Sequence, residues 1–328
     1  MRMLFCTVLS VFWVSVFVFS QDYKNWVRYA PRLSVEYLRS DTARMVAANV
    51  MAHGIENGAW PKNINFFNVE VRGDIRATID SLAALSPQHT LDEATIDNGA
   101  TTTEVRFLMR MYEEWKDSVY LQRAINGVNY LLSMQYDNGG FPQYFPRNDH
   151  YHAHITFNDN AMTSALRLLL AVSRREYPYA HLPLEMSLQA SVAVDKGIEC
   201  ILDCQYVQNG RRTIWAQQYD EKTLKPVGAR AFELKGLCTA ESVAVVEFLQ
   251  QVRDWHSEVD DAIKAAVQWF AENRLEDGCW ARFYTLEDNR PFFCGRDGIM
   301  RFSIEEIDEE RQKGYAWYNT SAARLLQH

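Results

Sequence analysis

Apolar side chains recur along this chain at intervals of three and four residues, the spacing that places them on one face of an α-helix. After residue 160, for example, Met162, Leu166, Leu169 and Leu170 form such a stripe. The same pattern predicts helices over residues 26–54, 105–116, 121–134, 161–174, 184–205, 238–254, 258–273, 303–313 and 317–326. The alternating pattern of a strand is short and rare, at residues 213–217 and 281–284. The sequence therefore predicts a mostly α fold.

Polar residues mark the starts of two of these helices. Thr101 and Glu104 have the spacing of a capping box, in which each side chain bonds the backbone N–H of the other residue. Further along, Asn158, Asp159 or Asn160 is a candidate N-cap, because Asn and Asp side chains accept hydrogen bonds from the first backbone N–H groups of a helix.

A turn signal recurs at the ends of the helical segments, about every 70 to 80 residues. An Asn-Gly or Asp-Gly pair gives the left-handed turn that ends a helix, and we expect the aromatic residue after it to pack over the helix ends. These aromatic residues are Trp60, Phe141, Trp215 and Trp280. Repeated helical hairpins need neighbours to bury their apolar faces, and a closed ring supplies them without exposed ends. We therefore predict an α/α toroid with long loops and a few short strands, rather than an open solenoid.

Three polar clusters, each close to the start of a helical segment, carry the candidate chemistry. They are residues 97–104, 156–160 and 228–233. If the hairpins repeat in space, all three clusters face one end of the ring. An N-cap role explains one such cluster well and three less well. Asp97, Asp159 and Arg230 together would form a site for oxygen-ligated Ca²⁺ and an anionic ligand.

Composition and charge narrow the function classes. The chain has 328 residues, is 48% hydrophobic and carries a formal net charge of −8, which argues against general nucleic-acid binding. Arg2, the apolar run that ends at Phe19 and the small Ser20 together resemble a signal peptide over residues 1–20, with a short membrane anchor as the alternative. We expect a secreted or periplasmic monomer, without stable membrane insertion, whose residues 21–328 form a single catalytic domain.

The cysteines do not indicate a disulfide-rich fold or a zinc site. Five remain after residue 20, an odd number, and none has C-x-x-C spacing. Cys200 and Cys204 lie four residues apart on a predicted helix, where we expect them to pack as small apolar side chains. His150, His152 and His154 alternate and would share one side of a strand as a metal site, but a solvated loop explains them better.

Several sequence blocks resemble the family 10 polysaccharide lyases, the pectate lyases, and the match covers most of residues 40–320. The main blocks are Ile96-Asp97-Asn98-Gly99-Ala100-Thr101-Thr102, Gly140-Phe141-Pro142-Gln143-Tyr144, Ile155-Thr156-Phe157-Asn158-Asp159-Asn160-Ala161-Met162 and Gly228-Ala229-Arg230-Ala231-Phe232-Glu233. Shorter blocks agree in order at Trp60-Pro61-Lys62-Asn63, Gly295-Arg296-Asp297-Gly298 and Gly314-Tyr315-Ala316-Trp317-Tyr318. The departures are Ala59 in place of Gly, Lys235 in place of Pro and Tyr219 in place of His.

This resemblance implies an (α/α)₃ toroid that cleaves polygalacturonate, the pectin backbone, by calcium-assisted β-elimination. It assigns Arg230 as the catalytic base, Asp159 as a carboxylate that binds Ca²⁺ together with the substrate, and Asp97 as a second essential acidic residue. Substrate-binding candidates are Arg296 and Arg311 for the uronate carboxylates, Asn158 beside the metal ligand, and Trp60 and Tyr144 for stacking on sugar rings. Packing of the aromatic turns explains Trp60 and Tyr144 equally well, and Arg311 has the alternative of a charged helix face.

The chemistry of the implied reaction can be argued from the residue types. Elimination removes the proton on C5, next to the uronate carboxylate, and Ca²⁺ on that carboxylate stabilises the negative charge that develops. Arginine is an unusual base because its pKa lies above ~12. We expect nearby positive charges to lower the pKa of Arg230 and the enzyme to have an alkaline optimum. Glu233 would either orient this base or be an ordinary ion-pair partner.

Two other functions stay open at this point. One is a glycoside hydrolase on a similar ring, with Asp97 and Asp159 as acid and base, which would need neither Arg230 nor Ca²⁺. The other is a non-catalytic protein that binds polyuronate without turnover.

Overall fold

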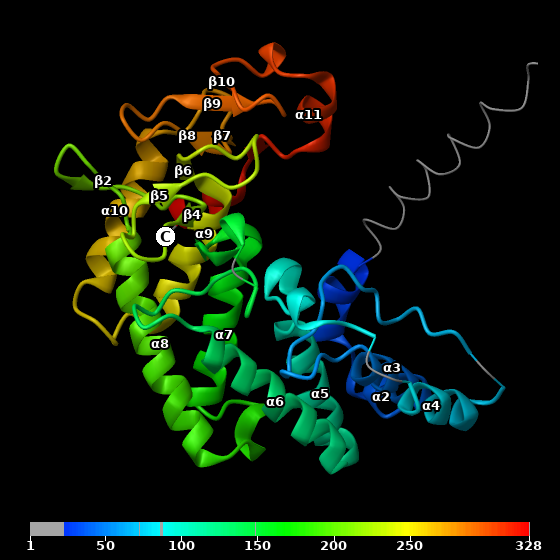
Figure 1. Cartoon of the computed structure of the whole chain (residues 1–328). Coiled ribbons are helices and arrows are strands. Elements are labelled where there is room, and N and C mark those ends of the chain that lie inside the picture. Colours follow the sequence, from blue (N-terminus) through cyan, green and yellow to red (C-terminus); the bar gives the residue numbers. More distant parts are fainter. Residues whose placement is uncertain (1–22, 72, 86–87, 148, 328) are drawn as a thin grey trace, which may run out of the picture. The chain divides into compact units, whose positions relative to one another are not determined.

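The computed structural model describes residues 23–71, 73–85, 88–147 and 149–327, drawn in colour in Figure 1. The predicted signal peptide, residues 1–20, lies outside the described residues. Contacts within the chain divide it into two compact units. Unit 1 comprises the chain up to Ser133 together with Arg175–Pro183, and unit 2 comprises Met134–Arg174 and Leu184–His328. In the part of the chain that the structure describes, no helix has the length and apolar character needed to span a membrane.

Unit 1 is helical. Its helices are α2 (Val35–Leu38), α3 (Asp41–Ala52), α4 (Ile75–Ala83), α5 (Thr102–Trp115) and α6 (Ser118–Met134), whose last residue begins unit 2. Helix α3 starts where the Ser40 hydroxyl accepts a hydrogen bond from the Ala43 N–H, and it packs against α4 and α5. The predicted helix over residues 26–54 is therefore interrupted between α2 and α3. Helix α4 was not predicted, although Ile75, Ile79 and Leu82 have helical spacing in the sequence.

Unit 2 contains the longest helix and most of the strands. Its helices are α7 (Ala161–Ser173), α8 (Leu184–Cys204), α9 (Thr239–Leu249), α10 (Val259–Glu272) and α11 (Glu309–Gly314). The stripe that predicted α7 is buried, and α7 packs along α8. Together with unit 1, these helices confirm a mostly α fold. The segment after residue 317 differs from its prediction, because it forms a short strand and a 3₁₀ turn rather than an α-helix.

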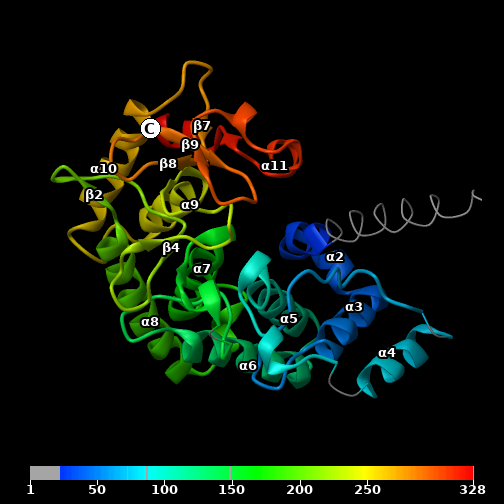
Figure 2. The same cartoon turned by 45° about the horizontal axis from the view of Figure 1, so that its top comes forward.

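The strands of unit 2 are short and pair antiparallel, and Figures 1 and 2 show strands β6 to β9 gathered at one end of helix α9. They are β1 (Ile155–Thr156), β2 (Val207–Gln208), β3 (Arg211–Arg212), β4 (Gln218–Tyr219), β5 (Pro226–Val227), β6 (Leu237–Cys238), β7 (Trp280–Ala281), β8 (Phe283–Tyr284), β9 (Pro291–Cys294), β10 (Met300–Arg301) and β11 (Tyr318–Asn319). The sheet orders are β1-β4-β5, β10-β9-β8-β6, β11-β7 and β2-β3. The strand expected at 281–284 corresponds to β7 and β8. The strand expected at 213–217 was wrong, because that segment lies between β3 and β4.

The recurring turn forms as the sequence predicts. Gly58, Gly139, Gly210 and Gly278 all have positive φ, between +77° and +100°. The aromatic residue after each turn is fully buried. The indole N–H of Trp60 donates to the Val50 carbonyl (2.7 Å), that of Trp215 to Ile201 (2.7 Å) and that of Trp280 to Phe270 (2.9 Å). Each ring thus bonds the C-terminal part of the helix that precedes its turn, which leaves that helix fewer unsatisfied carbonyls.

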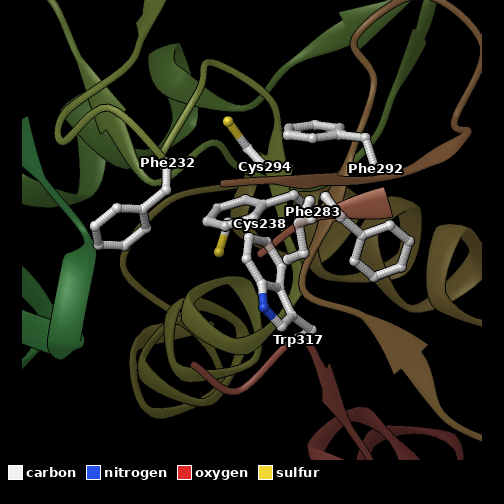
Figure 3. Close-up of a cluster of buried hydrophobic side chains, with 8 residues drawn as sticks. Phe232, Cys238, Phe283, Phe292, Cys294 and Trp317 are labelled. Carbon is white, nitrogen blue, oxygen red and sulfur yellow. The ribbon is translucent and has the colours of Figure 1, made fainter. Parts of the chain in front are cut away.

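An aromatic core cluster lies under the β6–β10 sheet of unit 2. Its buried members are Phe232, Cys238, Phe283, Phe292, Phe293, Cys294, Ile307 and Trp317, six of which are labelled in Figure 3. The rings of Phe283 and Phe292 stack with centroids 5.6 Å apart. The register of β6 on β8 pairs Cys238 with Phe283 and fixes this packing. The five cysteines of the described chain are buried and unbridged, so Cys200 and Cys204 pack as small side chains, as predicted.

Both predicted helix caps were wrong. Thr101 has φ +61° and makes no side-chain cap bond; its hydroxyl instead donates to the Thr95 carbonyl (2.8 Å) and accepts from the Trp60 N–H (3.1 Å). The carboxylate of Glu104 accepts from the Trp26 indole N–H at 2.6 Å. At α7 the N-cap is Asn160, in a left-handed conformation and without a side-chain bond to the helix. The polar residues at these positions therefore do something other than capping.

Candidate active site

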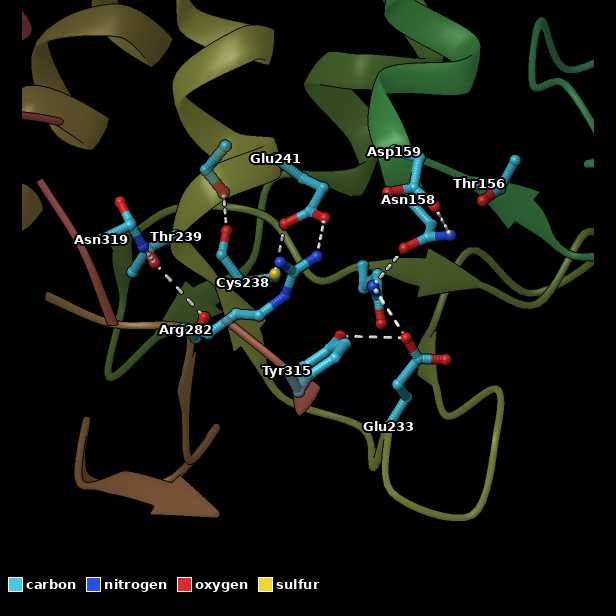
Figure 4. Close-up of polar contacts among 12 residues, drawn as sticks. Thr156, Asn158, Asp159, Glu233, Cys238, Thr239, Glu241, Arg282, Tyr315 and Asn319 are labelled. Atoms are coloured by element: carbon cyan, nitrogen blue, oxygen red, sulfur yellow. Dashed lines mark hydrogen bonds and ion pairs between the residues drawn. The ribbon is translucent and has the colours of Figure 1, made fainter. Parts of the chain in front are cut away.

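The polar cluster before α7 forms a tight turn that holds Asp159 in an exposed position. Residues 158–160 make one 3₁₀ turn in which Asp159 has φ +50° and Asn160 has φ +59°. Asn158 is buried and its amide donates to the Asp159 carboxylate at 2.8 Å (Figure 4). Strand β1 leads into this turn, and the Phe157 N–H donates to the Gln217 carbonyl at 2.9 Å. The β1–β4 sheet therefore places the Asp159 turn beside Gln217.

The Arg230 guanidinium is held by a carboxylate three residues away. Nε donates to Glu233 Oε2 at 2.6 Å and Nη2 to Oε1 at 2.5 Å, a bidentate pair. The Arg230 side chain is 45% exposed, whereas that of Glu233 is 2% exposed. The buried Glu233 carboxylate thus orients the more exposed Arg230 side chain.

This pairing contradicts the expectation that neighbouring positive charges lower the pKa of Arg230. Burial does lower it, but the hydrogen bond and charge of Glu233 outweigh burial, and the pKa of Arg230 is raised above its usual range. For Glu233, burial raises the pKa, but Arg230 and Tyr315 outweigh burial and the pKa is lowered. Both groups are therefore charged at neutral pH.

Three of the predicted arginines meet around one phenylalanine ring. The guanidinium carbons of Arg230 and Arg311 lie 4.8 Å from the centroid of Phe232, and that of Arg296 lies 5.9 Å from it. Glu310 accepts hydrogen bonds from both Arg296 (3.0 and 3.2 Å) and Arg311 (2.8 and 2.5 Å). Three guanidinium groups thus lie close together, and Glu233, Glu310, Asp159 and Asp308 balance much of their charge. Guanidinium groups can grip the carboxylate of a ligand through paired hydrogen bonds.

Arg296 and Arg311 differ in burial. The Arg296 side chain is 63% exposed, and Arg311 is 8% exposed as a residue. The alternative of Arg311 on a solvated helix face is therefore wrong, because its side chain is covered by Phe232 and Glu310.

Further polar contacts lie next to Glu233, as Figure 4 shows. The Tyr315 hydroxyl donates to Glu233 Oε1 at 3.0 Å, and the Arg282 guanidinium carbon lies 4.8 Å from the centroid of the Tyr315 ring. Arg282 pairs with Glu241, which also accepts from Cys238 Sγ at 2.6 Å. Burial lowers the pKa of Arg282, but the charge of Glu241 outweighs it and the pKa is raised. Arg282 and Glu241 thus form a largely buried ion pair next to Tyr315.

In unit 1, Asp97 has a different environment. It is 2% exposed, and its carboxylate pairs with the Lys62 ammonium and accepts from the Asn98 N–H at 3.0 Å. Asn98 follows with φ +52°. The Lys62 side chain remains 31% exposed. The acidic residue predicted at this position is therefore a buried anion whose partner is a half-exposed cation.

The two aromatic residues predicted to stack on sugar rings are buried. Trp60 is fully buried, with the Arg123 guanidinium carbon 4.5 Å from its ring centroid. Tyr144 is 7% exposed and packs against His152 at 4.8 Å. A sugar platform needs an open ring face, so turn packing is the correct interpretation of both residues.

The three alternating histidines do not form a metal site. They lie at a 3₁₀ turn rather than on a strand, and His150 is 81% exposed at its side chain. His152 bonds Asp149 and His154 bonds Glu221. The loop interpretation is thus correct.

A calcium site can be tested against the donors that are present. Within the described residues, no three His, Cys, Asp or Glu side chains gather closely enough to hold a metal. Asp159 offers one exposed carboxylate, and Ca²⁺ takes six to eight oxygen ligands. The residues therefore fit a Ca²⁺ that a bound uronate and water complete, and they do not fit a cation held by protein side chains alone.

Sequence reasoning missed most of the supporting residues. Phe232, Gln217 and Tyr315 lie in or beside the recognised blocks, so their neighbourhood was a signal, but their contacts were not predictable from spacing. Arg282 and Glu241 carried no signal, because they meet only through the pairing of β6 with β8.

The chain is similar to known polysaccharide lyases. The sequence model of the family described as pectic acid lyase matches residues 54–279 and 276–326. A solved family 10 polysaccharide lyase from Cellvibrio cellulosa is 30% identical, with 93% of this chain and 94% of that chain covered and a TM-score of 0.79. An aspartate-to-alanine mutant of that lyase, solved in complex with trigalacturonic acid, is 29% identical with a TM-score of 0.79, over 93% of this chain and 95% of its own. Among curated proteins none matches. The predicted fold class, mostly α with the architecture of these lyases, is confirmed.

Proposed function

Because this chain belongs to the pectic acid lyases, within polysaccharide lyase family 10, we propose that it cleaves α-1,4-polygalacturonate by calcium-dependent β-elimination with Arg230 as the base. Membership of a lyase family makes the chain a polysaccharide lyase, which sets aside the hydrolase and the binding protein. The observation that carries the finer proposal is the meeting of Arg230, Arg296 and Arg311 around Phe232, because clustered guanidinium groups can bind the carboxylates of polyuronate.

In the proposed reaction, Arg230 takes the C5 proton. Glu233 engages Nε and Nη2, and among the described residues Nη1 makes no hydrogen bond, so Nη1 is the nitrogen that faces the substrate. The C5 electron pair forms the C4–C5 double bond as the C4–O bond breaks, and a proton from water completes the departing sugar hydroxyl. Asp159 would hold Ca²⁺, which would supply Lewis-acid stabilisation of the enolate-like charge.

Arg296 and Arg311 hold substrate carboxylates in this proposal. Arg296 is exposed enough to meet an incoming chain, and its guanidinium can grip a carboxylate through two parallel hydrogen bonds. Arg311 is buried beside the ring of Phe232, so it can bind only a carboxylate that comes directly against it. Asn158 keeps the Asp159 carboxylate oriented through its amide.

Asp97 contributes through Lys62. A buried carboxylate beside a half-exposed ammonium holds that ammonium in place and charged. We propose that Lys62 binds a uronate carboxylate and that Asp97 is essential because it positions Lys62. A single catalytic domain over residues 21–328 is part of this proposal.

The proposal extends to the setting of the enzyme. A polymer in plant cell walls is met outside the cell, so we propose export through the signal peptide at residues 1–20, followed by action as a monomer. We also propose an alkaline optimum, because the neutral form of Arg230 becomes more abundant as pH rises, even though the ion pair with Glu233 raises the pKa of Arg230 and makes that form scarcer.

The direct test follows the ultraviolet absorbance of polygalacturonate with the mature protein, first with Ca²⁺ and then with excess chelator. We expect a calcium-dependent rise from the conjugated unsaturated product, which Arg230→Ala abolishes and Arg230→Lys restores only in small part. Arg212→Ala is the matched control, since Arg212 also pairs with a carboxylate (Glu258, 2.9 Å) but lies on β3 outside the site. New reducing ends without absorbance, or full activity in Arg230→Ala, would contradict the proposal.

A further inference from the structure

The Glu233 carboxylate is the point on which the position of Arg230 depends. It is almost fully buried and receives hydrogen bonds on both oxygens: Oε2 from Arg230 Nε, and Oε1 from Arg230 Nη2, the Tyr315 hydroxyl and, at 3.5 Å, Gln217 Nε2. A bidentate grip requires the carboxyl group to be ionised, so that both oxygens accept, and to be held in the plane of the guanidinium. Whatever fixes Oε1 therefore also fixes Arg230.

Tyr315 is also held by residues other than Glu233 and Arg230. Its ring packs against Trp317 with centroids 4.9 Å apart and against Phe232 at 5.4 Å. On its other side the Arg282 guanidinium, locked by Glu241, lies 4.8 Å from the ring centroid. Burial raises the pKa of Tyr315, so the hydroxyl keeps its proton and acts as a donor. The hydroxyl is thus a fixed donor aimed at Glu233, as Figure 4 shows.

We propose that Tyr315 is a positioning residue of this lyase: its hydroxyl keeps the Glu233 carboxylate ionised and oriented, and through that carboxylate it sets the geometry of Arg230. This inference rests on the proposed role of Arg230 as the base. No atom of Tyr315 needs to touch the substrate for this role.

A pH dependence follows from the same contacts. The Tyr315 hydrogen bond and the Arg230 pair both favour the ionised carboxylate, and together they hold the pKa of Glu233 below its usual value against the opposing effect of burial. Once Glu233 is protonated it offers one good acceptor instead of two, and the grip on Arg230 is lost. Activity should therefore fall on the acid side as Glu233 takes up a proton, and loss of the Tyr315 hydroxyl should move that fall to higher pH.

Other charged and titratable groups surround this pair, and the test must leave them unchanged. They come from the Asp159 turn, helix α9, the segment between β7 and β8, the β9–β10 turn and helix α11. They are Asp159, Cys238, Glu241, Arg282, Arg296, Glu310 and Arg311. Replacing Tyr315 by Phe alters none of them and keeps the ring in contact with Arg282, so a change in the acid limb reports the hydroxyl alone.

The experiment measures kcat and kcat/KM against pH for Tyr315→Phe. We expect kcat to fall about tenfold, since a hydrogen bond to a charged group is lost. We also expect KM to change less than about twofold and the acid limb to rise by about one pH unit. Tyr284→Phe is the matched control, because that buried hydroxyl bonds the Asn273 carbonyl (3.1 Å) in the same unit and has no contact with Glu233. An unmoved acid limb in Tyr315→Phe, or an equal movement in Tyr284→Phe, overturns the inference.

A second measurement separates this inference from the role of Arg230. Thermal unfolding is followed from neutral to acid pH in the wild type, Tyr315→Phe, Glu233→Gln and the double variant. A carboxyl group whose pKa is lowered in the folded state contributes stability that is lost as pH falls through that pKa. Tyr315→Phe should raise the folded-state pKa of Glu233, so this variant should lose the contribution of Glu233 at a higher pH than the wild type does. In the Glu233→Gln background the tyrosine substitution should cause no such difference. This result stands even if Arg230→Ala proves active, whereas an identical effect in both backgrounds overturns the inference.

Discussion

Asp97 and Asp159 lie in similar 3₁₀ turns, but at different positions of the turn and in different electrostatic settings. Each belongs to a 3₁₀ turn that comes just before a helix and contains a left-handed residue, Asn98 (φ +52°) in one and Asp159 itself (φ +50°) in the other. Asp97 is buried against the Lys62 ammonium. Asp159 is exposed and receives a hydrogen bond from the neutral Asn158 amide.

The difference shows that the turn alone does not decide the chemistry. A cation arriving at Asp97 competes with an ammonium that is already in place, whereas a cation arriving at Asp159 meets an exposed carboxylate that accepts from a neutral amide and interacts with the charges of Arg230 and Arg282. We propose that these different partners separate a positioning role for Asp97 from a metal-binding role for Asp159.

The sharpest way to break this comparison is Asp159→Asn, which keeps the size of the side chain and removes its charge. We expect activity on polygalacturonate to fall about a thousandfold, equivalent to about 4 kcal/mol of transition-state stabilisation. Added Ca²⁺ should restore little of it. Asp195→Asn, on the exposed side of α8 and paired with His256, is the control. A wild-type calcium titration in Asp159→Asn would remove this residue from the metal site.

The ion pair of Asp97 with Lys62 predicts an effect on stability. Asp97→Asn leaves Lys62 without its anion, and we expect a loss of about 3 kcal/mol in the free energy of unfolding, the low end for a broken buried pair because Lys62 is partly exposed. Chemical denaturation measures this loss. In the double variant Asp97→Asn, Lys62→Met, stability should largely return while activity stays low. Recovered activity in the double variant would show that neither charge takes part in catalysis.

Unit 1 holds a further carboxylate whose charge state depends on pH. Burial raises the pKa of Glu104 to about 7, and the Trp26 indole lowers it only in part. An acid with a raised folded-state pKa binds its proton more tightly in the folded chain, so stability falls as pH rises from the unfolded pKa to the folded one. We expect the wild type to lose about 2 kcal/mol between pH 5 and 7 from this group. Glu104→Gln should abolish that slope in unfolding experiments, and an unchanged slope would rule out titration of Glu104 in this window.

Local signals explain what the sequence could predict. Turns at Gly58, Gly139 and Gly278 follow from residue pairs that favour positive φ, and the stripe after residue 160 follows from helical periodicity. Arg230 was predicted from the sequence block at residues 228–233, and its bidentate partner Glu233 lies only three residues away.

Long-range pairing explains what the sequence could not predict. The contact of Arg282 with Glu241 depends on the register of β6 and β8, and that of Tyr315 with Glu233 joins residues 82 positions apart. Nothing in residue spacing encodes such contacts. The wrong prediction of a side-chain cap at Thr101 has the same cause, because its hydroxyl bonds Thr95 and Trp60 rather than its own helix.

Within unit 2 the finest comparison is between Arg296 and Arg311, which share Glu310 and the ring of Phe232 but differ in burial. Exposed charge pairs are worth less than about 1 kcal/mol, so Arg296→Lys should raise KM for polygalacturonate only about threefold and leave kcat and stability unchanged. The rise should be larger at high salt, because a single ammonium holds a carboxylate less firmly than a guanidinium fork does. Arg311→Lys is the matched variant, and it should lower the melting temperature as well, since its guanidinium is packed against Phe232. If Arg296→Lys instead abolished activity, the substrate would have to bury Arg296 on binding, and the two arginines would be equivalent in the complex although they differ in the free enzyme.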